Sequence, residues 1–187
     1  MNEDRSLKIL RNIMALLAGG AALLMLFFFG VIRFIPEPSW HGLYPGMEMK
    51  AIPKNWKEPR NASKKGRWAD KASEMGIYAT EISLKETGDV VYNLNVVNGK
   101  ISEIDFKCNR DIGMQMAEFA KKNYDFYSGG HSLMFTSRFP SMKHIFINKD
   151  IVQEGYRIEW SDSRLQQEFD KRFSKLTLET MFSNDGE

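Results

Sequence analysis

The hydrophobic pattern of the chain begins with a long apolar run. Residues 13–32 contain no charged residue and show no polar stripe. As a helix, these twenty residues would rise roughly 30 Å, the thickness of the hydrocarbon core of a bilayer. A secretory signal peptide has a shorter apolar region and ends at small residues, whereas this run is followed by Arg33 and Phe34. We therefore expect an uncleaved membrane anchor over residues 13–35, after a short tail of residues 1–12.

Small residues recur along one side of the expected anchor. Ala15, Gly19 and Ala22 are spaced by four and three residues, which lets two helices approach closely in lipid. The pattern therefore indicates a candidate surface for self-association. The alternative is that alanine and glycine are simply common in membrane spans.

The charges that flank the run bear on its orientation. Arg5, Lys8 and Arg11 precede it and Arg33 follows it, so the positive-inside rule favours a cytoplasmic N-terminus. We expect a bacterial inner-membrane protein whose C-terminal domain is periplasmic. Eight Lys and Arg residues between positions 50 and 71 lie at the edge of the counting window and leave the reverse orientation open.

A proline-rich segment follows the anchor. Five of the six prolines lie between positions 36 and 59, and proline fixes φ and removes a hydrogen-bond donor. We expect residues 36–66 to form an extended basic stalk. Its candidate contacts with the membrane surface are aromatic or positively charged: Trp40, Tyr44, Lys54, Lys57, Lys64, Lys65 and Arg67. Alternatively, the stalk is a solvated tether whose tryptophans fold back on the domain. A net charge of +2 is too balanced to indicate nucleic acid as a partner.

Three later runs alternate apolar and polar residues with a period of two, which predicts half-buried strands. Their apolar members are all even-numbered and fall within 78–84, 90–96 and 104–108. A shared apolar face requires loops of three residues, at 86–88 and 97–99, in an antiparallel meander. This arrangement pairs Leu84 with Val90 and Tyr92 with Ile104.

The rest of the chain repeats this order of strands and a helix. We expect a helix over 111–127, strands over 132–139, 144–148 and 155–160, and a last helix over 163–182 that begins with a capping box of Ser163 and Gln166. A short helix over 67–75, ended by Gly76, precedes the strands. The predicted fold class is α+β: a soluble domain of residues 67–187 with two three-stranded meanders in one antiparallel sheet and two helices on its apolar face.

Residues suited to catalysis are few. The single cysteine, Cys108, excludes an intramolecular disulfide, and His41, His131 and His144 lack metal-ligand spacing. No spacing requires Cys108 and His144 to form a thiol dyad. We expect no catalytic residues, no metal and no cofactor, and therefore no enzyme.

Two places remain as candidate binding sites. Glu103 and Asp105 share a strand face near Glu81, together with Asn93, Asn95, Lys107, Val91 and Ile101. This face is either a solvated surface or a rigid binding surface, and paired carboxylates also suit acid–base chemistry. The second candidate is the binding loop of Ser128, Gly129, Gly130 and His131, because loops on a rigid scaffold carry function.

The pattern as a whole favours a single-pass, membrane-anchored protein-binding module. An accessory, immunity or exclusion-type factor of a bacterial envelope secretion or transfer system fits this description. The alternatives are a module that binds anionic lipid through the basic stalk and an anchored hydrolase that acts on envelope material.

Overall fold

The computed structural model divides the chain into two compact units, Met1–Glu37 and Pro38–Glu187. The residues that it describes are 3–33, 36–57, 67–84, 90–128, 132–137, 142–150 and 155–183.

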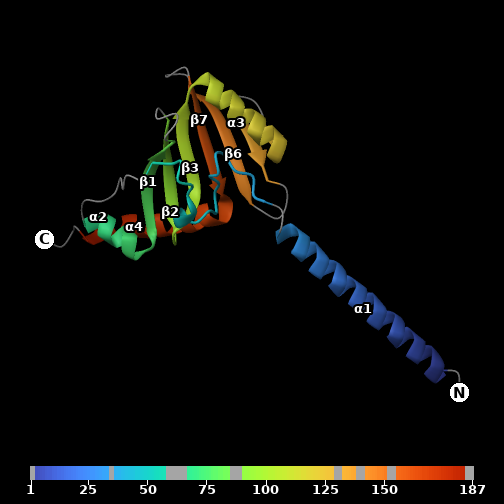
Figure 1. Cartoon of the computed structure of the whole chain (residues 1–187). Helices are drawn as coiled ribbons and strands as arrows, with labels where there is room; N and C mark the ends of the chain where they lie inside the picture. Colours follow the sequence, from blue (N-terminus) through green and yellow to red (C-terminus); the bar gives the residue numbers. More distant parts are fainter. Residues whose placement is uncertain are drawn as a thin grey trace. The chain divides into compact units, whose positions relative to one another are not determined.

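The first unit is one helix, α1 (Glu3–Arg33), drawn in blue in Figure 1. Within it, Leu10–Phe27 is a stretch of 18 residues that is long and apolar enough to cross a membrane. Eighteen residues rise about 27 Å, close to the hydrocarbon thickness of a bilayer. The length and composition of α1 are therefore compatible with the expected anchor.

The second unit is built on one antiparallel sheet of seven strands, which confirms the α+β class. Its strands are β1 (Ile77–Ser83), β2 (Val91–Val97), β3 (Lys100–Cys108), β4 (Asp125–Ser128), β5 (Ser132–Thr136), β6 (Lys143–Asp150) and β7 (Gly155–Asp162). Its helices are η1 (Met49–Ala51), α2 (Arg67–Glu74), α3 (Arg110–Asn123) and α4 (Ser163–Ser183). The strands lie in the order β1-β2-β3-β7-β6-β5-β4, so the last strand in sequence is the central one (Figure 1).

The second meander has four strands rather than the three predicted. The predicted helix over 111–127 ends at Asn123, because Tyr124 has an extended backbone (φ −132°, ψ 155°). Its ring is buried in the core, and Asp125–Ser128 continues as β4. Asn109 is the N-cap of α3, because its side chain accepts a hydrogen bond from the backbone N–H of Ile112 at 3.0 Å.

The hairpin of β1 and β2 has the predicted register. Ser83 pairs with Val91 and Ile82 with Tyr92, which is the offset expected from pairing Leu84 with Val90. The loop at 86–88 lies outside the described residues.

The turn between β2 and β3 differs from the prediction. It contains two residues, Asn98 and Gly99, whose φ angles of 51° and 74° are those of a type I′ turn. Val97 therefore pairs with Lys100 and Tyr92 with Phe106, so the predicted three-residue loop and the predicted pairing of Tyr92 with Ile104 are wrong.

A β-bulge next to this turn brings the apolar faces into agreement. Asn95 pairs with Glu103, whereas Val96 pairs with Ile101, so β3 holds one extra residue, Ser102. The bulge turns Ile101 into the core, which corrects its expected place among the polar residues. The hydroxyl of Ser102 donates a hydrogen bond to the backbone oxygen of Asn95 at 3.0 Å.

The two longer helices of the second unit pack on opposite faces of the sheet. On β2, Leu94 joins the larger core cluster with Met116 of α3. Val97, three residues later and therefore on the other face, joins a second cluster with Phe169 and Leu176 of α4. We call the side of α3 the core face and the side of α4 the polar face. The expectation that both helices share one apolar face is wrong.

Residues 38–57, which we call the strap, belong to the compact unit and do not form a free stalk. Leu43, Met47 and Trp56 are buried in the core cluster, and the strap crosses in front of the strands in Figure 1. The backbone N–H of Gly46 donates to the oxygen of Ile101 at 2.7 Å, and the N–H of Ile101 donates to the oxygen of Met47 at 2.9 Å. The buried side chains of the strap and its hydrogen bonds to Ile101 show that the strap is part of the folded domain. The domain therefore begins at Pro38 rather than at residue 67.

Helix α4 begins at a different cap from the one predicted. The carboxylate of Asp162 accepts hydrogen bonds from the backbone N–H groups of Arg164 and Leu165 at 3.1 and 3.2 Å, so Asp162 is the N-cap and the capping box of Ser163 and Gln166 is wrong. Gln166 instead donates to Asp170 at 3.0 Å.

Gly113 allows α3 to pack closely against the sheet. A Cβ atom at Gly113 would lie 2.6 Å from Cδ2 of Tyr156 on β7, so Gly113→Ala is expected to lower the free energy of unfolding by about 1–3 kcal/mol through overpacking. At an exposed helix position the same change would be favourable by about 0.5–1 kcal/mol. Urea unfolding in detergent micelles, followed by circular dichroism, measures the difference. In a Tyr156→Ala background the loss should disappear, and an equal loss in both backgrounds would contradict this packing.

Candidate binding surface

The polar face carries an ordered array of side chains, because the registers of six strands place residues in rows. One row crosses the sheet through Glu81, Asn93, Asp105, Glu159, Phe146 and Met134. The next row holds Asn95, Glu103, Ser161 and His144. Lys107 and Arg157 pair in the row on the other side. The central strands β3 and β7 thus contribute most of the charges.

Arg157 organises the charged part of these rows. Its Nε donates to Oδ1 of Asp105 at 3.1 Å, and its Nη2 donates to Oδ2 of the same carboxylate at 3.2 Å. Nε also lies 3.2 Å from a carboxylate oxygen of Glu159. The two carboxylates, Asp105 above all, raise the pKa of Arg157. This planar fork holds three side chains of β3 and β7 in a fixed arrangement.

Glu103 is the half-buried member of the array. Nδ2 of Asn95 donates a hydrogen bond to its Oε2 at 2.7 Å. Desolvation raises the pKa of Glu103, and the nearby carboxylates of Glu159, Asp105 and Asp170 raise it further, while the bond from Asn95 acts in the opposite direction.

This shift predicts how stability depends on pH. Because the pKa of Glu103 is higher in the folded protein than its ordinary value of 4.5, the folded state holds the proton more tightly than the unfolded state. The free energy of unfolding should therefore fall as the pH rises from about 4.5 through the pKa of the folded state. Glu103→Gln should remove this loss and stabilise the protein at pH 7 relative to the unmodified chain. Urea unfolding at a series of pH values measures it.

The control for this experiment is Glu118→Gln, which removes an exposed carboxylate of α3. If the two variants and the unmodified chain show the same pH dependence, the assignment of the effect to Glu103 is wrong.

Helix α4 borders the array on one side. It packs on β1, β2, β3 and β7, and Asp170 is the α4 carboxylate that acts on Glu103. Arg172 ties the helix to the sheet, since its Nη1 donates to the backbone oxygen of Met75 at 2.7 Å and to the side chain of Asn98 at 2.8 Å. Its Nη2 also bonds to Glu168. The array therefore lies beside a helix that is itself fixed in place.

The residues predicted to contact the membrane differ in their surroundings where the structure describes them. The ring of Trp40 packs on Phe119 of α3, with 5.7 Å between centroids, and Tyr44 lies under the ammonium of Lys143 at 5.0 Å. Both aromatic rings are therefore used within the domain. Lys54 and Lys57 are exposed. Lys64 and Lys65 lie outside the described residues, and Arg67 begins α2.

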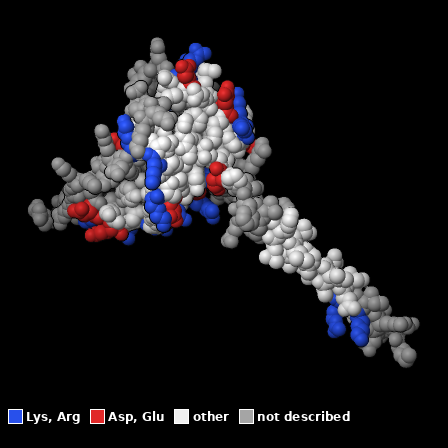
Figure 2. Space-filling view, in the orientation of Figure 1, with Lys and Arg blue, Asp and Glu red and all other residues white. Residues whose placement is uncertain are grey.

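Figure 2 shows the side of the second unit that the strap crosses. A broad area without charged residues lies in this view, and Lys and Arg side chains lie directly beside it as well as at the edges of the surface. The described part of the strap exposes Lys50, Lys54 and Lys57 together with Glu48, which pairs with Lys50 at 2.9 Å.

The predicted binding loop is described only at its first residue. Ser128 ends β4 and pairs with Met134, whereas 129–131 lie outside the described residues. The two residues before it, Phe126 and Tyr127, are exposed. The sequence pattern does not predict this exposed aromatic pair, because the helix expected over 111–127 contains both residues.

The thiol–imidazole pair is separated by the sheet. Cys108 joins the core cluster, whereas His144 pairs with Ser161 and lies on the polar face. Burial raises the pKa of the Cys108 thiol to about 11, so the thiolate is disfavoured at neutral pH. Among the described residues there is no group of three His, Cys, Asp or Glu side chains that could hold a metal ion.

The ion pairs of the array could not be predicted from neighbouring residues alone. The alternation in 155–160 places Arg157 and Glu159 on one strand face, but the sequence does not indicate that β7 pairs with β3. That pairing brings Arg157 to Asp105, 52 residues away. The sequence does contain the signal for the face, although not for the neighbouring strand.

Comparison of the chain with protein-family models, with curated proteins and with solved structures finds no match in any of the three. The function of the chain is therefore inferred from its own residues.

Proposed function

We propose that the protein is a membrane-anchored protein-binding module whose contact surface is the array on the polar face of β3, β7 and β6. α1 supplies the anchor and the sheet supplies a rigid surface. An accessory, immunity or exclusion-type factor of a bacterial envelope secretion or transfer system is the class of protein that we propose for this arrangement, with the N-terminus cytoplasmic and the second unit periplasmic.

One observation carries the proposal: the array combines fixed charges with apolar side chains in a single row. Asp105 and Glu159 hold Arg157, and Phe146 and Met134 continue the same row on β6 and β5. Protein interfaces combine charges that set partner and register with apolar groups that are desolvated on contact. A strand surface also supplies this pattern without ordering a loop on binding, which lowers the entropic cost of association.

The small stability contribution expected from the ion pairs of Arg157 supports a role other than folding for these charges. The side chains of Arg157, Asp105 and Glu159 are about 49, 26 and 33 % exposed, and ion pairs with this much solvent contact contribute about 0–1 kcal/mol to stability. The three charges are therefore largely dispensable for the fold. A binding surface gives their arrangement a function.

Site-specific photo-crosslinking in intact cells tests this proposal. A benzophenone amino acid is placed at Lys107, on the polar face beside Arg157, and at the control position Lys149, which is also exposed. Lys149 follows Asn148 on β6 and therefore points to the other face of the sheet. We expect a discrete adduct from position 107 that is absent from position 149.

A second pair of variants tests the charges themselves. Asp105→Asn with Glu159→Gln removes both carboxylates at nearly constant shape, and we expect the adduct at position 107 to be lost while circular dichroism shows an unchanged fold. Equal adducts from both positions, or an adduct that is unaffected by the double substitution, would contradict the proposed surface.

A further inference from the structure

The end of α3 and the start of β4 expose an unusual group of side chains. Phe126 and Tyr127 on β4 are 59 and 73 % exposed, and Lys121 and Lys122 in the last turn of α3 are exposed as well. We call these four residues the α3–β4 patch. The ring of Phe126 contacts Phe135 of β5 at 5.6 Å between centroids, but most of Phe126 and of Tyr127 stays exposed, and adjoining exposed apolar side chains mark a candidate contact site.

Two ring contacts link the start of the second unit to the residue that precedes β4. Trp40, near the start of that unit, packs on Phe119 of α3, and Phe119 in turn lies 6.2 Å from Tyr124 between ring centroids. Tyr124 directly precedes β4. The first residues of the strap are thus one ring contact away from the C-terminal half of α3.

Few residues separate the start of the second unit from the end of α1. Pro38 begins the compact unit and Arg33 ends the helix, so five residue steps join them. A fully extended chain covers at most about 18 Å in five residues. Whatever direction the two units take relative to each other, the covalent chain limits how far residue 38 can be from the end of the anchor.

We propose that the α3–β4 patch rests on the headgroup layer of the membrane that holds α1. The inference rests on the membrane anchoring proposed above. Tyr and other aromatic rings favour the interface between headgroups and acyl chains, and lysine stems lie along apolar surface while their ammonium groups stay in the headgroup region.

The charges near the patch bear on whether its contact with lipid depends on the charge of the headgroups. Glu118 and Asp125 are exposed beside Lys121 and Lys122, so two negative charges balance two positive ones. The aromatic rings, rather than net charge, therefore provide the attraction. We expect the contact to form on zwitterionic as well as on anionic lipid.

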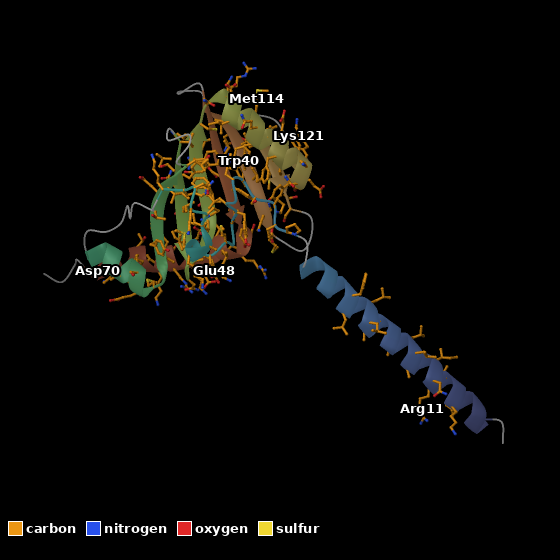
Figure 3. The ribbon with its side chains drawn as sticks, in the orientation of Figure 1. Arg11, Trp40, Glu48, Asp70, Met114 and Lys121 are labelled. Carbon is orange, nitrogen blue, oxygen red and sulfur yellow. The ribbon has the colours of Figure 1, made fainter. Side chains whose placement is uncertain are left out.

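Spin labels on one helix test the proposal with the full chain in vesicles of zwitterionic phosphatidylcholine. Lys122→Cys and Met114→Cys place a nitroxide on the same helix α3, whose two ends are marked by Lys121 and Met114 in Figure 3. Met114 is exposed and serves as the matched control. Cys108 is buried, and burial raises the pKa of its thiol, so the label reacts preferentially with the introduced cysteine.

The expected result is a difference between the two ends of α3. The label at 122 should collide less often with a water-soluble nickel chelate, and more often with oxygen, than the label at 114. Adding Phe126→Ser and Tyr127→Ser should abolish this protection of position 122. Adding anionic lipid should leave it unchanged.

Four outcomes would overturn the inference. Equal nickel accessibility at 122 and 114, or protection that survives the loss of both rings, would show that the patch does not rest on lipid. Protection that requires anionic lipid would assign the contact to charge. Spin–spin broadening at 122 would show that a second copy covers the patch. A chain that does not float with the vesicles would show that α1 does not anchor the protein. This result would overturn both proposals, and it differs from the four results above, in which the chain is bound to the vesicles.

Discussion

Replacing Trp56 with alanine is expected to lower the free energy of unfolding of the second unit by about 3–5 kcal/mol. Trp56 is 4 % exposed, and its ring lies 4.9 Å from the ring of Tyr92 in an edge-on contact. Its indole N–H donates to the backbone oxygen of His41 at 3.2 Å, so the substitution removes both a packed ring and a link within the strap. Urea unfolding in detergent micelles, followed by circular dichroism, measures the loss.

The matched control for this substitution is Lys57→Ala, one residue along the chain and exposed. A surface substitution of this kind should change the free energy of unfolding by no more than about 0.5 kcal/mol. If Trp56→Ala costs as little as Lys57→Ala, residues 38–57 behave as a free stalk, and the boundary at Pro38 is wrong.

Leu176→Ala is expected to lower the free energy of unfolding by about 2–5 kcal/mol. Leu176 of α4 is fully buried and packs with Ile77, Val97 and Phe169 in the smaller cluster on the polar side of the sheet. Since this cluster contains few residues, a cavity there removes a large share of the contacts that hold α4. The same unfolding experiment measures the effect.

Leu178→Ala provides the comparison, because it changes the same residue type on the same helix at a position that is 55 % exposed. It should alter the free energy of unfolding by about 0.5 kcal/mol or less. Equal losses for both leucines would contradict the placement of α4 on a second face.

The strands were the most predictable part of the fold. Period-two alternation depends only on neighbouring residues, so it located β1, β2, β3 and β7 from the sequence. Tyr156, Ile158 and Trp160 lie on one face of β7 as expected, opposite Arg157 and Glu159. The register of β1 and β2 also followed from the shared parity of their apolar positions.

The even-numbered spacing of the apolar residues could not show whether a three-residue loop or a β-bulge brings the apolar faces of β2 and β3 together. A three-residue loop at 97–99 and a two-residue turn followed by a bulge at Ser102 both place Tyr92 and Phe106 on one face. The choice depends on the positive φ of Asn98 and on the hydrogen bond that Ser102 donates, and neither is encoded in the apolar pattern.

The strap was missed because its burial depends on distant partners. Prolines indicate an extended chain, and the strap contains little regular helix or strand, so that part of the local reasoning agrees with the structure. The pattern does not show that Leu43 and Met47 meet a sheet formed by residues much later in the chain. The alternative that the tryptophans fold back on the domain describes Trp40 and Trp56.

The polar face shows the same division between local and distant information. Alternation along β3 was enough to place Glu103 and Asp105 on one face, and its polar neighbours Asn93 and Asn95 followed from β2. The fork with Arg157 depended on the pairing of β3 with β7, the last strand of the chain. The predicted loop at 128–131 and the self-association of α1 through Ala15, Gly19 and Ala22 stay predictions.

The central claim is that α1 holds the folded unit on a membrane, and a phosphatase fusion tests it most directly. Alkaline phosphatase is fused after Glu187, and its activity is measured in the membrane fraction after osmotic shock and a high-salt wash. We expect active enzyme that stays with the membranes, which places an anchored second unit in the periplasm. Activity released by osmotic shock would contradict the anchor, and an inactive fusion in the membrane would contradict the proposed orientation.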